Sequence, residues 1–443
     1  MAEIHRQAEY PIIVDAVEEE EKEEDKKQGE PPLWAERALF HFKRGLQGSA
    51  FFSNLYAPPA GDPLYFHNSD PPRQQQRQRA SQLLQSLTGK DGRMTCAIQR
   101  KLLHDAAQVQ HILSAEREAL PARTVNYLER VRIAFSTVAT SPSAGGFACH
   151  RDARAPPPLD TAALEALLLD IPLDVLAGSW RKVLHMAAPA APPGNGNPIR
   201  ASVYADAEWG ASVFRERNML VVDDFLTDDA LRALRKHLLT SSIWNAAPKE
   251  SFVGTTVSEG VMAHAVTVRL GAEITRAFPR IFCRGKRRMN QAWAYSYHNF
   301  EGVPQEGIGI HADESAINAN LWIGGEEEGE EEEEAGDQES RGGEDENGLV
   351  VYDKEAPLDW DFKEYNNAGK PARARLAAFL EDAPWYNVKY RSNRLILFNG
   401  NLFHESMPLV VGPGFRRRRI NLTLLFGKRG ARCLDDAGLR REL

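Results

Sequence analysis

Two kinds of hydrophobic pattern divide the chain. In residues 97–113, apolar side chains recur every three to four positions, which is the spacing of one helix face. Residues 162–171 are apolar nearly all round, which is typical of a buried helix. They follow a run of three prolines, which would end any preceding helix. These patterns predict a mostly α-helical N-terminal region over residues 33–186.

Downstream of residue 198 the pattern changes. Thr227 can cap a helix in which Leu231, Leu234 and Leu238 fall on one face. The later segments are short apolar runs or alternate apolar with polar positions, and Gly, Asn, Pro or charged residues bound them. Strands are predicted at residues 219–222, 291–297, 317–323, 349–352, 394–398 and 420–426. The expected class is α+β, with an all-β core preceded by helices.

Composition marks the boundaries between these regions. Residues 187–198 (AAPAAPPGNGNP) are rich in Pro and Gly, which predicts a linker. We expect a disordered acidic leader at residues 1–32, a helical region at 33–186, one domain at 199–430 with a disordered acidic insertion at 326–347, and a C-terminal tail at 431–443.

The net charge is concentrated in two acidic tracts. The 443 residues include 54 Lys+Arg and 62 Asp+Glu, a formal net charge of -8. Residues 326–346 hold 13 acidic residues and one Arg, and residues 15–30 hold nine acidic residues and three Lys. The rest of the chain has 50 Lys+Arg against 40 Asp+Glu, a net charge of +10. Like-charge tracts repel and stay solvated, so the total says little about a site.

We expect no address for secretion and no membrane span in the sequence. Its N-terminus lacks the basic start and the apolar core of about 7–15 residues that signal peptides have, and no run reaches the roughly 18 apolar residues of a membrane span. The cysteines lie far apart without a C-x-x-C pair, which favours a reducing compartment. We expect a cytoplasmic or nuclear protein without a membrane partner.

Candidate metal ligands lie in two segments of the β-rich half. In Gly-Ile-Gly-Ile-His311-Ala-Asp313, alternate residues of an extended backbone project to the same side, so His311 and Asp313 can reach one metal ion. The strand at 394–398 leads through a polar turn to His404. Two imidazoles and one carboxylate make the facial triad that suits Fe(II) and leaves coordination positions open.

A basic strand follows His404. Arg419, Asn421 and Thr423 alternate and share one face, and a guanidinium pairs bidentately with a carboxylate, as the distal carboxylate of 2-oxoglutarate requires. Four consecutive arginines end at Arg419, so the register stays open. Arg417 shares the face of Arg419, and a slip by one residue would place Arg418 there instead.

Together these motifs resemble the 2-oxoglutarate and Fe(II)-dependent dioxygenases, in particular the prolyl-4-hydroxylase-like branch, over residues 218–427. The resemblance implies a C-terminal double-stranded β-helix, a jelly roll, with flanking helices. It implies that His311, Asp313 and His404 bind Fe(II) and that Arg419 holds the cosubstrate 2-oxoglutarate. O₂ would be the second cosubstrate, with ascorbate as an optional reductant.

The resemblance also implies the walls of the site. Tyr295 or Tyr297, on the strand before the His-x-Asp segment, would line the pocket, or both would simply pack. Asn421 and Thr423 would border the cosubstrate. Further wall residues would alternate on the next strand, at Asn318, Asn320 and Trp322.

The implied activity is hydroxylation of a protein side chain or of a small metabolite, with decarboxylation of 2-oxoglutarate to succinate. A nucleic-acid demethylase of the same superfamily ranks last, because the basic residues form only short clusters and no nucleic-acid module is recognisable. The alternative from another class is a non-catalytic interaction or scaffold protein. The chain keeps all three candidate metal ligands and an arginine on the cosubstrate face of its strand, which argues against that alternative.

Overall fold

The computed structural model describes residues 96–120, 122–140, 197–244, 251–256, 261, 264–299, 307–324, 348–366, 370–408 and 414–430. The leader, the tail, the predicted helix at 162–171, the acidic insertion and all but the last two linker residues lie outside the described residues. The predicted domain boundaries therefore stay predictions.

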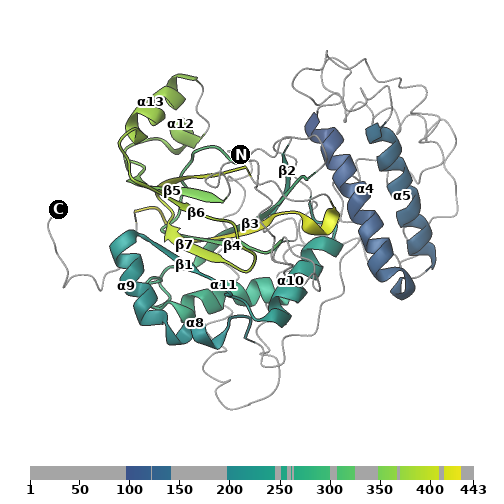
Figure 1. Cartoon of the computed structure of the whole chain (residues 1–443), viewed down its shortest axis with the longest axis horizontal. Helices are drawn as coiled ribbons and strands as arrows, with labels where there is room; N and C mark the ends of the chain where they lie inside the picture. The colour runs from purple at the N-terminus through teal and green to yellow at the C-terminus, as the bar shows by residue number, and fades with distance from the viewer. Residues whose placement is uncertain are drawn as a thin grey trace, which may run out of the picture.

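Two long helices form the described part of the N-terminal half and pack side by side (Figure 1). They are α4 (Cys96–Glu116), followed by the short 3-10 helix η3 (Arg117–Ala119), and α5 (Ala122–Thr140). The predicted apolar stripe of α4 is buried, since Leu102, Val109 and Leu113 are 2% exposed or less. Burying this stripe against Leu128 and Val131 of α5 supplies the stability that an isolated helix lacks. The helix predicted at residues 97–113 is confirmed.

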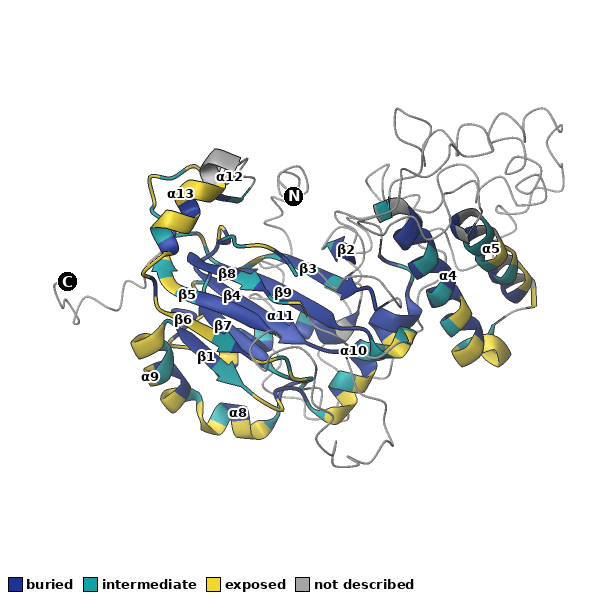
Figure 2. Cartoon of the chain, turned by 45° about the horizontal axis from the view of Figure 1, so that its top comes forward, coloured by how far each residue is buried: buried dark blue, intermediate teal, exposed yellow. Residues whose placement is uncertain are grey.

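The β core is a six-stranded antiparallel sheet with the order β1-β7-β4-β9-β3-β2. Strands β4 and β9 are buried along their whole length (Figure 2), because both faces of the sheet are covered. All of these strands except β2 were predicted. The strands are β1 (Met219–Val222), β2 (Phe252–Thr256), β3 (Met289–Tyr297), β4 (Ile317–Trp322), β7 (Leu395–Asn399) and β9 (Ile420–Phe426).

Helices from the segment that precedes and connects the first strands pack on one face of this sheet (Figure 1). Their apolar residues share one core with alternate residues of the strands, and Leu234, Leu270 and Leu397 within it have no exposed surface. Thr227 caps α10 as predicted, because its side chain accepts a hydrogen bond from the Ala230 N–H at 3.3 Å. The helices are α8 (Ala201–Ala205), α9 (Ala207–Arg217), α10 (Asp228–Thr240) and α11 (Ala265–Ala277).

The other face packs against a second antiparallel sheet with the order β6-β5-β8. Between the two sheets, Trp322, Ile396 and Phe398 meet Leu349 and Val351 in a separate apolar core. The predicted α+β class, with antiparallel sheets and flanking helices, is confirmed. The second sheet consists of β5 (Leu349–Glu355), β6 (Trp385–Val388) and β8 (Leu402–Ser406), and the β5–β6 connection contains α12 (Phe362–Asn366) and α13 (Lys370–Leu380).

Helix α4 also buries a polar stripe against the β core. Lys101, His104 and Asp105 are 8% exposed or less, and both Lys101 and His104 contact the Asp105 carboxylate. Asp105 stabilises the charge of Arg418, which is itself 1% exposed. Burial nevertheless lowers the pKa of Arg418 to about 9, because desolvation disfavours the charged form. Buried charges therefore join α4 to the start of β9.

The cysteines differ from the expectation. Cys96 and Cys283 are disulfide-bonded, whereas a reducing compartment favours free thiols. Sequence spacing could not reveal this, because distant positions in the chain meet only in the fold. Within the described residues, no helix is both long enough and apolar enough to cross a membrane.

Candidate metal centre

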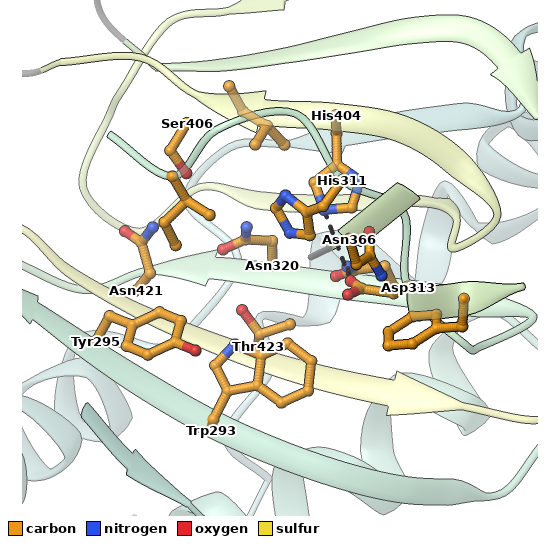
Figure 3. A pocket seen from close by; sticks show the side chains of 14 residues that line it. Trp293, Tyr295, His311, Asp313, Asn320, Asn366, His404, Ser406, Asn421 and Thr423 are labelled. Atoms are coloured by element: carbon orange, nitrogen blue, oxygen red, sulfur yellow. Dashed lines mark hydrogen bonds and ion pairs between the residues drawn. The ribbon is translucent and has the colours of Figure 1, made fainter. Parts of the chain in front are cut away.

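His311, Asp313 and His404 meet between the two sheets (Figure 3). His311 and His404 pair like residues of neighbouring strands: each N–H donates to the carbonyl of the other, at 2.9 and 2.8 Å. The Asp313 N–H donates to the Gly400 carbonyl at 2.9 Å, in the turn between β7 and β8. These bonds hold the His-x-Asp loop (residues 307–313) against β8, the strand that carries His404. His404 therefore lies within a strand of its own and not in a loop after the strand at 394–398.

Two glycines permit this close approach. A Cβ atom on Gly307 would lie 1.5 Å from the Ser406 carbonyl oxygen, and one on Gly400 would lie 2.0 Å from the Ser315 Oγ. A larger residue in place of Gly307 would push the His-x-Asp loop away from β8, and one in place of Gly400 would displace Ser315, which lies shortly after that loop. The glycines therefore set the spacing on which the three candidate ligands depend.

The three side chains are spaced as ligands of one ion. Their potential donor atoms all lie within 4.8 Å of one another, and 3.6 Å separates the His404 Nε2 from the Asp313 Oδ2. Atoms bound to one metal at about 2.0–2.2 Å lie roughly 3 Å apart, so small side-chain adjustments suffice. Among the residues that the structure describes, no other group of His, Cys, Asp or Glu has this arrangement.

Backbone acceptors select the tautomer of both imidazoles. The Nδ1 of His311 lies 2.8 Å from the Gly309 carbonyl, and the Nδ1 of His404 lies 3.0 Å from the Leu402 carbonyl. A carbonyl only accepts, so each Nδ1 carries a proton, and in the neutral ring the Nε2 lone pair is then available to a metal. Burial lowers the pKa of His404 to about 4, which keeps its ring neutral near pH 7.

Asn318 has a more specific place than the wall position predicted for it. Its Nδ2 donates to the Asp313 Oδ2, and the side chain is buried at 1% exposure. Asn318 is the first polar residue of β4 and lies five residues after Asp313. It holds one carboxylate oxygen in place, and outer partners of this kind tune metal affinity.

We expect Asn318→Ala to weaken Fe(II) binding by about 10-fold to 100-fold, because Asp313 loses its orienting donor. Anaerobic titration of the metal-free protein measures the dissociation constant. Asn320→Ala is the matched control, because Asn320 lies two residues further on the same strand and lines the same cavity without bonding a candidate ligand. Equal metal affinities of the two variants would contradict this role of Asn318.

A cavity opens beside the three candidate ligands, with walls from both sheets (Figure 3). Tyr295 and Asn320 line it, as do Asn421 and Thr423 from β9, so these predicted site residues lie around one space. Tyr297 and Trp322 are not among the lining residues; they are buried beneath the Arg419 guanidinium, with ring centres 4.7 and 5.7 Å from its Cζ.

Arg419 is buried behind Asn421 with no carboxylate partner among the described residues. It is 1% exposed; its Nε donates to the Asn421 Oδ1 at 3.2 Å, and its Nη1 donates to the Met407 carbonyl at 3.1 Å. Arg418 points elsewhere: its Nε donates to the Asn299 Oδ1 at 3.2 Å, and it lies within the electrostatic reach of Asp105 on α4. Arg417 belongs to the 3-10 helix η7 (Phe415–Arg417).

Several lining residues were not predicted from the sequence. Ser406 follows His404 at the strand period of two, which could have found it. Phe362 and Asn366 lie on α12, a five-residue helix without an amphipathic signal, and nothing local connects that helix to the site. The lining residues without a prior prediction are Trp293, Ile308, Leu349, Phe362, Asn366 and Ser406.

Comparisons with known proteins give distant matches among solved structures. No family model matches the sequence, and no curated protein does so significantly. A prolyl-4-hydroxylase from Pseudomonas putida matches at 15% identity over 52% of this chain and 100% of its own, with a TM-score of 0.31.

Two further matches are of similar quality. An oxidoreductase of the 2OG-Fe(II) oxygenase family from Burkholderia pseudomallei matches at 12% identity over 53% of this chain and 95% of its own, with a TM-score of 0.31. EctD from S. alaskensis, with bound Fe, matches at 15% identity over 55% and 84%, with a TM-score of 0.33. At such identities and TM-scores, the matches do not define what this chain binds or converts.

Proposed function

We propose that the chain is an Fe(II)- and 2-oxoglutarate-dependent oxygenase that hydroxylates its substrate. The proposal rests on one observation: the potential donor atoms of His311, Asp313 and His404 lie within 4.8 Å of one another, beside a cavity. Two imidazoles and one carboxylate are the ligand set that suits Fe(II) with open positions. Two facing antiparallel sheets with this cavity between them support a double-stranded β-helix, or jelly roll, as the specific fold.

Bound iron would supply the oxidative chemistry toward 2-oxoglutarate and O₂, and the chain would supply binding and orientation. The Nε2 atoms of His311 and His404 and the carboxylate of Asp313 would hold the ion from one side. Asn318 would keep the Asp313 carboxylate oriented through its amide. The buried walls would exclude water from the reacting groups.

A buried cation supports the place that we propose for the cosubstrate. Arg419 is 1% exposed and has backbone and amide acceptors but no carboxylate partner among the described residues. A buried charge is costly unless it is paired, so an incoming carboxylate would bind strongly there. The distal carboxylate of 2-oxoglutarate would meet this requirement from the cavity side, where the wall includes Thr423 and Asn421, the acceptor of the Arg419 Nε–H bond. Decarboxylation at the other end of the molecule would leave succinate.

The walls indicate the chemical class of the group that is hydroxylated. Apart from the three candidate ligands, the lining residues carry no charged side chain, and Trp293, Tyr295 and Phe362 contribute aromatic surface. We therefore favour an uncharged aliphatic or ring group, whether it belongs to a protein side chain such as proline or to a small metabolite. The cavity has no Lys or Arg among its lining residues, so nothing in its walls favours a nucleic-acid substrate.

Anaerobic addition of Fe(II) and then 2-oxoglutarate tests the binding half of the proposal. We expect a weak visible charge-transfer band that appears only when both are present, because the 2-oxo acid would bind the iron directly. Succinate in place of 2-oxoglutarate serves as the control and gives no band. Tight Fe(II) binding without any change on addition of 2-oxoglutarate would contradict the proposed cosubstrate.

A further inference from the structure

Asn366 at the end of α12 bonds the residue between two of the candidate metal ligands. The Ala312 N–H donates to the Asn366 Oδ1 at 3.0 Å, and the Asn366 Nδ2 donates to the Ala312 carbonyl at 2.7 Å. Ala312 stands between His311 and Asp313 in the sequence and has no exposed surface. The side-chain amide thus forms the same closed pair of bonds that a neighbouring strand would form.

This pair completes the backbone bonding of the His-x-Asp loop. On one side, His311 pairs with His404 and the Asp313 N–H donates to the Gly400 carbonyl. The peptide groups of Ala312 point the other way, where no strand of the described residues pairs with them. Without the Asn366 amide, a buried N–H and a buried C=O would lack partners, which is unfavourable for each group.

Helix α12 contacts the second ligand-bearing segment as well. Tyr365 packs edge-on against Phe403, the residue before His404, with ring centres 5.6 Å apart. Tyr365, Phe403 and Ala312 belong to one buried apolar cluster, to which α13 contributes Leu376. A helix of five residues has little stability of its own, so these contacts fix its position.

The same helix faces the cavity. Phe362 and Asn366 are four residues apart, lie on one helix face and both line the cavity, and Asn366 lies close to Asp313 in the view of Figure 3. One short helix therefore bonds the His-x-Asp loop, packs beside His404 and forms part of the wall.

We propose that Asn366 is a positioning residue that sets the spacing of His311 and Asp313 for the metal. The inference rests on the proposed function, because it assumes that these residues bind a metal ion. Asn366 acts through the Ala312 peptide groups and needs no contact with the ion. Loss of its amide leaves all three ligands present but frees the loop that carries two of them.

The test is the metal affinity of Asn366→Ala in the full chain, measured by anaerobic Fe(II) titration and repeated with Co(II). We expect both dissociation constants to rise by about 10-fold to 100-fold, as for other groups that orient metal ligands. The visible spectrum of bound Co(II) should also change, because the ligand geometry relaxes. Neither readout depends on turnover.

Asn393 provides a matched control. Its amide makes the same closed pair with a different backbone, since the Leu226 N–H donates to its Oδ1 at 2.8 Å and its Nδ2 donates to the Leu226 carbonyl at 3.0 Å. Asn393 has a φ of 60° and does not line the cavity, so Asn393→Gly removes the amide without backbone strain. This variant should lose stability yet keep the wild-type metal affinity and Co(II) spectrum.

The outcomes separate the inference from the proposed function. Absence of metal binding by the wild-type chain would overturn the proposed function itself. Wild-type metal affinity and an unchanged Co(II) spectrum in Asn366→Ala would overturn only the role of Asn366. If Asn366→Ala does not fold, Asn366→Gln is measured, whose longer stem displaces the loop; a wild-type affinity in that variant would overturn the inference equally.

Discussion

Replacing His311 or Asp313 with Ala is expected to abolish stoichiometric Fe(II) binding and all 2-oxoglutarate turnover. Each variant leaves two of the three ligand residues. The change of side chain does not affect the backbone hydrogen bonds that hold the loop, which join His311 to His404 and Asp313 to Gly400. The folded chain should therefore remain, with an incomplete metal site. Metal content after anaerobic reconstitution and desalting measures the effect.

His111→Ala is the control for the loss of a histidine. His111 lies on α4, contacts Phe415 with tilted rings whose centres are 5.4 Å apart, and belongs to no candidate metal group among the described residues. This variant should bind one Fe(II) per chain as the wild type does. Full iron occupancy in His311→Ala and in Asp313→Ala would show that the proposed triad is not the metal site.

Arg419→Ala is expected to raise the dissociation constant for 2-oxoglutarate by roughly a hundredfold while Fe(II) binding stays intact. A bidentate pair between a guanidinium and a carboxylate in a buried site is worth about 3 kcal/mol, and each 1.4 kcal/mol is about tenfold in affinity. Titration of the anaerobic Fe(II) protein with 2-oxoglutarate measures the constant. Arg419→Lys should recover part of the loss, because it restores the charge but not the fork.

Arg418→Ala tests the register of the four arginines. Its side chain lies on the α4 side, beside Asp105 and Asn299, so its loss removes one of the two cations that face the buried Asp105 carboxylate and leaves only Lys101. We expect a less stable protein whose folded form binds 2-oxoglutarate as the wild type does. Weakened 2-oxoglutarate binding in Arg418→Ala, together with wild-type binding in Arg419→Ala, would reverse the assignment.

Local rules were sufficient to predict part of the set of residues that gather around the cavity. His311 and Asp313 are two positions apart, and an extended backbone places such residues on one side. The same parity brings Asn421 and Thr423 of β9 to the cavity. It could not decide whether Tyr295 or Tyr297 lines the space, because both share that parity and only the fold places Arg419 over Tyr297.

Contacts between distant segments could not be predicted. Asn366 lies 54 positions after Ala312, and a short polar helix in a connection gives no sign of its partner. The polar stripe of α4 was equally uninformative. Lys101, His104 and Asp105 recur at helical spacing, as on a solvent-facing side, yet they are buried, and the Asp105 carboxylate interacts there with Lys101 and, less strongly, with Arg418.

Succinate formation tests the central claim most directly. Wild-type chain, at a concentration equal to Fe(II), is mixed with 2-oxoglutarate and O₂, and succinate is measured against the Asp313→Ala variant under identical conditions. We predict at least one succinate for each bound iron in the wild type, one for each 2-oxoglutarate consumed, and none in the variant. A wild-type protein that is fully loaded with iron but forms no more succinate than Asp313→Ala would contradict the proposed function.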